Sequence, residues 1–174
     1  MSDMWDTIAG DAARESPLWA DALLSPTERR REVVFSPLAP PELALGVETI
    51  YEGYLVHYGS SRLFAPPDPD TALLLGDYLY AQGLVHVAAT GNVDAVADLA
   101  ELISLCSQVR AEARDGDGAA WAATAARLGD GGLDVARDAL RLRQDSGALE
   151  AGARAAAGGA PVDRALAAHA RLVG

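Results

Sequence analysis

The chain has 174 residues, a net charge of −11 and an isoelectric point near 4.5. This acidic balance excludes binding to nucleic acid or to an anionic membrane surface through bulk charge, because both attract basic proteins. Half of the residues are hydrophobic and 22% are charged, which excludes extensive disorder and allows a sizeable core.

Helix is favoured before any pattern is considered, because 36 residues are alanine, the strongest helix former, and β-branched residues are sparse. No strand-like alternation and no internal repeat is found. We therefore predict an all-α fold, a helical bundle in a single domain over residues 1–174.

The first helix signal is the segment Ser25-Pro26-Thr27-Glu28. Here Ser25 would be the N-cap, proline would take the first helical position and Glu28 would complete a capping box. The predicted helix carries three consecutive arginines and stops before Pro37.

Two long apolar helices are predicted next, at about residues 42–58 and 71–90. The first has apolar residues at three- and four-residue spacing, and the second has almost no polar face. A helix that is apolar on all sides is usually central or shared with a partner. We expect Asp68 or Asp70 to cap the second helix and Asn92 to cap the helix that follows.

The rest of the chain is predicted to be helical as well. Residues 93–114 are amphipathic, with Asp98 on the polar side, and two further helices should flank the glycine-rich turn at 129–132. The alanine-rich region 146–174 predicts two short, weakly packed helices, at 147–157 and 162–173.

The localisation is predicted to be cytoplasmic. Residues 1–10 contain Asp3 and Asp6 and no apolar core, so we expect no signal peptide. No stretch approaches the roughly 18 apolar residues that a membrane-spanning helix needs. The one cysteine, Cys106, excludes an internal disulfide and a cysteine-rich zinc site.

No catalytic residue, metal site or cofactor is predicted from the residues alone. None of His57, His86 and His169 has a histidine or carboxylate at the spacing of a metal pair on one helix face, so partly buried, hydrogen-bonded histidines are expected. Cys106 should be a small buried hydrophobe rather than a nucleophile.

Among the acids, Asp77 is the most unusual, because it lies within the most apolar helix. We expect it to be buried and paired with an arginine or several donors, since an unpaired buried carboxylate is costly. The pairs Asp115/Asp117 and Asp130/Asp134 are interpreted as turns and solvated helix ends.

Residues 73–81, Leu-Leu-Leu-Gly-Asp-Tyr-Leu-Tyr-Ala, followed by Gly91-Asn92, resemble a segment of the trans-polyprenyl diphosphate synthases. In that family a helix with a Gly-Asp-Tyr-Leu core precedes a short glycine-containing turn and another helix. The stretch Val47–His57 is similar to the family helix that leads into its first aspartate-rich motif. The resemblance covers about residues 42–112 and implies a truncated isoprenoid-synthase-like bundle.

The chain departs from this family where its metal-binding acids would stand. In active members the histidine is followed by two aspartates and, after two more residues, by another acid. Here His57 is followed by Tyr58-Gly59-Ser60-Ser61-Arg62, and no second aspartate-rich cluster occurs after Asp134. Because several carboxylates must hold magnesium ions against the departing pyrophosphate, we expect no metal binding and no activity of the chain alone.

The resemblance implies a non-catalytic small component (component I) of a two-component heptaprenyl or hexaprenyl diphosphate synthase. Its partner would be the catalytic subunit in a heterodimer, and the product would feed menaquinone side-chain biosynthesis. A homodimer stays open, as does a stand-alone helical interaction protein or an isoprenoid- or lipid-binding protein without enzymatic activity. Family dimers meet through the Gly-Asp-Tyr-Leu helix and the next one, so the predicted interface residues are Leu74, Asp77, Tyr78, Val85 and Leu99.

Overall fold

The computed structural model describes residues 3–174, so the first two residues of the predicted domain lie outside the described part of the chain. The described residues form nine α-helices and two short 3-10 helices, and their only strand-like feature is one isolated bridge between Leu23 and Phe64. The predicted all-α fold is confirmed. Within residues 3–174, no helix is both long and apolar enough to span a membrane.

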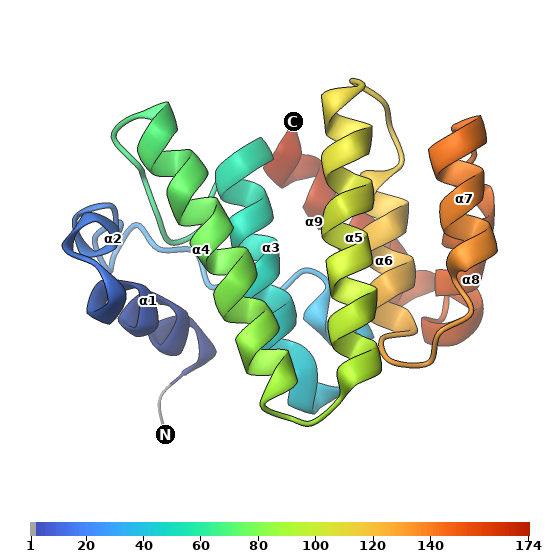
Figure 1. Cartoon of the computed structure of the whole chain (residues 1–174), viewed down its shortest axis with the longest axis horizontal. Coiled ribbons are helices and arrows are strands. Elements are labelled where there is room, and N and C mark those ends of the chain that lie inside the picture. The colour runs from blue at the N-terminus through green and yellow to red at the C-terminus, as the bar shows by residue number, and fades with distance from the viewer. Residues whose placement is uncertain (1–2) are drawn as a thin grey trace.

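The elements follow one another along the chain, and the longest connections are residues 22–35 before η1 and residues 59–68 before α4 (Figure 1). Their bounds are α1 Met4–Glu15, α2 Pro17–Asp21, η1 Ser36–Leu38, η2 Pro41–Leu43, α3 Ala44–Tyr58, α4 Pro69–Ala88, α5 Val93–Ala111, α6 Asp117–Ala126, α7 Asp134–Arg143, α8 Gly147–Ala157 and α9 Gly159–Val173. The helices predicted after residue 41 are all present, with bounds close to those expected.

Both predicted N-caps of the long helices are confirmed. The Asp68 carboxylate accepts a hydrogen bond of 2.8 Å from the backbone N–H of Thr71 at the start of α4. The Asn92 side chain accepts one of 2.9 Å from the backbone N–H of Ala95 at the start of α5. These side chains satisfy amide groups that have no partner within the helix.

The helix predicted from Ser25 is wrong. Half of the capping box does form, because the backbone N–H of Ser25 donates to the Glu28 carboxylate at 3.3 Å, but only a turn follows. The next residues are held by the rest of the protein instead. The backbone N–H of Arg30 donates to the carbonyl of Arg62 at 3.0 Å, and the backbone N–H of Val34 donates to the Glu48 carboxylate at 3.0 Å. Tertiary hydrogen bonds therefore override the local helix signal.

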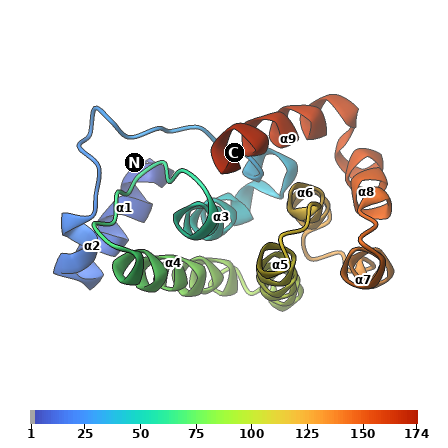
Figure 2. The same cartoon turned by 90° about the horizontal axis from the view of Figure 1, so that it is seen from above.

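Helix α3 is the centre of the fold, since all ten residues from Gly46 to Leu55 are buried. Helix α4 packs along it, and α6 completes the main core with Trp121 against the rings of Phe35, Tyr51 and Tyr54. Figure 2 shows α4 and α5 along one side of the molecule and α9 along the opposite side.

The alanine-rich C-terminal third packs more firmly than expected. Leu149 and Ala153 of α8 and Val162 and Leu172 of α9 are all buried in the main core. Alanine lets these helices approach α6 closely because its side chain is small. The prediction of weak packing over residues 146–174 is therefore wrong.

Candidate interaction surface and buried polar clusters

The outward side of α4 carries large apolar side chains in water. Leu74 and Val85 are 56% and 59% exposed, whereas Leu75, Leu79 and Val87 point inward and are buried. Leu74, Ala81 and Val85 follow one another at spacings of seven and four residues, which places them on one face of the helix. Half of the predicted all-apolar helix thus faces solvent.

The outward side of α5 carries small exposed residues, and near its start also Val93, which is 76% exposed, and the exposed Asp94. Ala97, Ala100 and Ser104 are exposed at three- and four-residue spacing. Figure 2 shows α4 and α5 along the same side of the molecule. We use the name α4–α5 face for the exposed residues Leu74, Asp77, Ala81, Val85, Ala97, Ala100 and Ser104, of which only Asp77 is charged.

The predicted interface residues divide into three groups. Leu74, Asp77 and Val85 lie on the α4–α5 face. Tyr78 is half-buried and stacks on Trp19 of α2, with ring centroids 6.1 Å apart, so it already has a partner within the chain. Leu99 is 1% exposed within the main core, so its predicted contact with a partner subunit is wrong.

The expectation for Asp77 also needs correction. Its side chain is 65% exposed and lies 3.2 Å from Nε2 of His57, with no arginine beside it. The pKa of His57 is lowered by burial, although the neighbouring Asp77 carboxylate acts in the opposite direction. Asp77 is thus a surface acid that pairs with a largely buried histidine, not a buried charge.

The remaining candidate side chains have structural surroundings. Nε2 of His86 lies 3.1 Å from a carboxylate oxygen of Asp11, although the two groups are not aligned for a hydrogen bond. Cys106 is buried, as predicted, and burial raises the pKa of its thiol well above the usual value. A thiol in such surroundings is a poor nucleophile.

A buried polar cluster around Asp117 was not predicted. At the start of α6, one oxygen of the Asp117 carboxylate accepts hydrogen bonds from the Tyr54 hydroxyl, from Nη2 of Arg110 at 2.7 Å and from Nε2 of His169 at 3.2 Å. Nδ1 of His169 lies 2.9 Å from the Tyr51 hydroxyl. Since an ionised carboxylate can only accept, the Nε2 proton of His169 points at Asp117.

This arrangement keeps Asp117 ionised. Burial alone would raise its pKa, but the hydrogen bonds from His169 and Tyr54 and the charges of His169 and Arg110 outweigh burial and hold the pKa well below its usual range. The partners link α3, α5, α6 and α9. The cluster therefore joins four helices, and the interpretation of Asp117 as a solvated helix end is wrong.

A second buried cluster surrounds Arg62, whose side chain is fully buried. Its guanidinium donates to the carboxylates of Glu48 at 2.6 Å and Glu52 at 2.8 Å, both on α3. The same guanidinium lies 4.6 Å from the ring centroid of Trp5 in α1. Two acids four residues apart in an otherwise buried helix are a sequence signal for such a cation, because they share one helix face.

A third pair links α5 and α7. Asp98 is buried and accepts a hydrogen bond of 3.0 Å from Arg137, so its predicted place on the polar side of α5 is wrong. Its second oxygen accepts the backbone N–H of Gly129 at 2.9 Å. The Asp98 carboxylate thus finds its partners within the chain, although Nε of Arg137 is buried without a hydrogen-bond partner among the described residues.

The segment 59–61, which follows α3, borders a groove of about 420 Å³. Gly59 and Ser61 line it, and its only acid is Asp68, which caps α4. Across residues 3–174, no group of three or more histidine, cysteine or acidic side chains is arranged to hold a metal ion. No family model, curated protein or solved structure matches the chain.

Proposed function

We propose that the chain is a non-catalytic subunit that binds a catalytic prenyl diphosphate synthase through the α4–α5 face, in isoprenoid biosynthesis for the menaquinone side chain. The observation that carries this proposal is the exposure of Leu74 and Val85, each more than half in water. Complete burial of such a side chain stabilises an assembly by roughly 1.5–3 kcal/mol. An apolar stripe of this kind is typical of an interaction surface.

The choice of partner rests on the resemblance of residues 42–112 to prenyl diphosphate synthases, whose dimers meet through the corresponding two helices. The small residues Ala81, Ala97 and Ala100 support a helical partner, because they let a second helix approach closely. The replacement of the metal-binding acids by residues 58–62 supports a role without catalysis of its own.

The test is the molar mass of the complex in solution. The chain is mixed with a full-length synthase from the same organism that carries both aspartate-rich motifs, and the mixture is analysed by size exclusion with light scattering. A stoichiometric complex is expected for the wild type and is lost for Val85→Glu. The matched control is Val135→Glu, since Val135 is 81% exposed but lies on α7; it should leave the complex intact.

Three results would overturn the proposal. The first is the absence of a complex when both proteins are at tens of micromolar. The second is a homodimer that Val85→Glu dissociates, because the α4–α5 face would then bind a second copy of the chain. The third is incorporation of labelled isopentenyl diphosphate by the chain alone above a no-protein control.

A further inference from the structure

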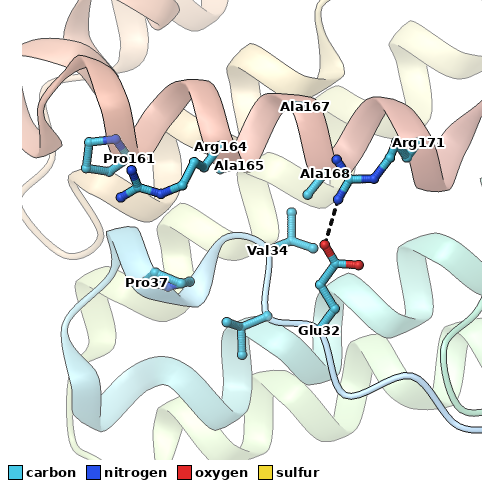
Figure 3. A pocket seen from close by; sticks show the side chains of 10 residues that line it. Glu32, Val34, Pro37, Pro161, Arg164, Ala165, Ala167, Ala168 and Arg171 are labelled. Carbon is cyan, nitrogen blue, oxygen red and sulfur yellow. Dashed lines mark hydrogen bonds and ion pairs between the residues drawn. The ribbon is translucent and has the colours of Figure 1, made fainter.

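A groove of about 410 Å³ runs between α9 and the segment 32–37, on the side of the molecule opposite α4 and α5 (Figures 2 and 3). This volume is within the roughly 300–1,000 Å³ of small-molecule sites. Its apolar lining consists of small or rigid side chains, namely Val33, Val34, Pro37, Pro161, Ala165, Ala167 and Ala168.

The net charge of the groove is opposite in sign to the net charge of the whole chain. Its charged residues are Arg164, Arg171 and Glu32, which together carry one net positive charge, whereas the chain carries −11. Arg171 forms an ion pair of 2.7 Å with Glu32 at one end of the groove (Figure 3). Figure 3 shows Arg164 extending from α9 toward Pro161, at the other end.

Arg164 is the free cation of the groove. Its guanidinium has no ion pair or hydrogen bond within residues 3–174, although most arginines of the chain are paired. A guanidinium presents donors in a planar fork that matches a carboxylate with two parallel hydrogen bonds. An anionic group at this end of the groove could therefore form an ion pair with the guanidinium of Arg164.

We infer that this groove binds a small amphiphile with one negative charge. Its carboxylate pairs with Arg164, and its apolar chain lies along Val34, Ala165 and Ala168. One net positive charge in the groove is neutralised by one negative charge, which favours a monocarboxylate over a diphosphate. The ligand contacts neither α4 nor α5, so this site is independent of the proposed interaction surface.

The experiment is a titration of the ¹⁵N-labelled chain with octanoate, followed by two-dimensional NMR. Octanoate should shift the amide signals of residues 164–168 in a saturable way. Octan-1-ol and octyltrimethylammonium have the same chain length without the negative charge, and they should bind at least tenfold more weakly.

Two variants and one control test the role of charge. Arg164→Gln should weaken octanoate binding at least tenfold, and Val33→Glu, at a position 43% exposed, should do the same by adding a negative charge. Arg143→Gln changes an exposed arginine of α7 and should leave binding unchanged. Val85→Glu, which should abolish association with the synthase, should also bind octanoate like the wild type.

The inference is overturned if the three amphiphiles bind equally, because this would indicate a general affinity for apolar chains. It is equally overturned if octanoate causes no saturable shifts, or if Arg164→Gln binds it as the wild type does. Because Val85→Glu reports on the other surface, a failure of the synthase partnership can be told from a failure of this site.

Discussion

Gly53 of α3 and Gly76 of α4 face each other so closely that a Cβ atom on Gly53 would lie 2.8 Å from the carbonyl oxygen of Gly76. Seven residues away on each helix, Gly46 and Gly83 repeat the approach, with 2.9 Å between a Cβ on Gly46 and the carbonyl oxygen of Gly83. Two glycine pairs at the same spacing form a seam that brings the two backbones together.

Because of this seam, a Gly→Ala substitution, which would normally stabilise a helix, should destabilise the protein here. Gly→Ala in a helix interior usually gains about 0.5–1 kcal/mol, but here the added methyl group meets backbone atoms. Overpacking of this kind costs about 1–3 kcal/mol. Gly53→Ala should therefore lower the free energy of unfolding, measured by denaturant titration, by about 1–2 kcal/mol.

The matched control is Gly152→Ala in α8, where nothing lies within 4 Å of the added Cβ atom. This substitution should raise the free energy of unfolding by about 0.5–1 kcal/mol. If both variants stabilised the protein, α3 and α4 would have room between them and the seam would not fix their distance.

The pair of the exposed Asp77 and the largely buried His57 gives a different prediction. Because the Asp77 side chain is 65% exposed, Asp77→Ala should change the free energy of unfolding by less than about 1 kcal/mol. The substitution should instead change the pKa of His57. Asp77 favours the protonated form of His57, so the pKa of His57, followed by NMR, should fall further in the variant.

A loss of about 3–5 kcal/mol, as expected for a buried ion pair that loses one partner, would instead place Asp77 in the interior. An unchanged pKa of His57 would show that the pair does not persist in solution. His86 provides an internal reference in the same spectra, since it faces Asp11 rather than Asp77.

The helices after residue 41 could be predicted because local signals agree with the fold there. The sequence pattern predicts caps at the starts of α4 and α5, and in the structure the side chains of Asp68 and Asn92 cap these helices. The segment after Ser25 could not, because its backbone bonds to Arg62 and to Glu48, which are distant in sequence. A capping box specifies how a helix begins, but tertiary partners decide whether it continues.

The candidate site was predictable only in part. Periodicity identified α4 as unusually apolar, and the structure shows Leu74 and Val85 exposed on it. Leu99 was assigned to the interface only because family dimers meet through the corresponding helix, and in the structure it is 1% exposed within the main core. Asp117 was missed because a Gly-Asp-Gly sequence is typical of a turn, and its partner His169 lies 52 residues away.

The ion cluster of Arg62 predicts a large loss of stability on mutation. Burial alone would lower the pKa of Arg62, but the charges of Glu48 and Glu52 outweigh it and raise the pKa above its usual value. Arg62→Met would leave two carboxylates buried without a cation. The free energy of unfolding should fall by about 3–5 kcal/mol.

The control for this variant is Arg171→Met, which breaks the surface pair with Glu32, where the side chains are 62% and 44% exposed. Surface pairs of this kind contribute about 0–1 kcal/mol. Comparable losses for Arg62→Met and Arg171→Met would contradict the view that burial makes the Arg62 cluster critical.

The last prediction concerns the acid dependence of stability. The pKa of Asp117 is lower in the folded chain than in the unfolded chain, where an aspartate titrates near pH 4. Its ionised form is therefore stabilised by folding. This contribution is complete above about pH 5 and is lost progressively as the pH falls through 4 toward the lower pKa of the folded state.

Asp117→Asn removes this contribution while keeping the shape of the side chain. At pH 7 the variant should be less stable by about 1.5–3 kcal/mol, the usual contribution of hydrogen bonds to a charged group. The difference from the wild type should shrink as the pH is lowered from 5 to 2, because Asp117 of the unfolded wild-type chain takes up a proton in this range while the folded chain keeps its carboxylate ionised. Asp130→Asn, at an exposed turn position, should change stability by less than about 0.5 kcal/mol at pH 7. A difference between wild type and Asp117→Asn that stays constant over this range would show that shape, and not the charge of Asp117, holds α3, α5, α6 and α9 together.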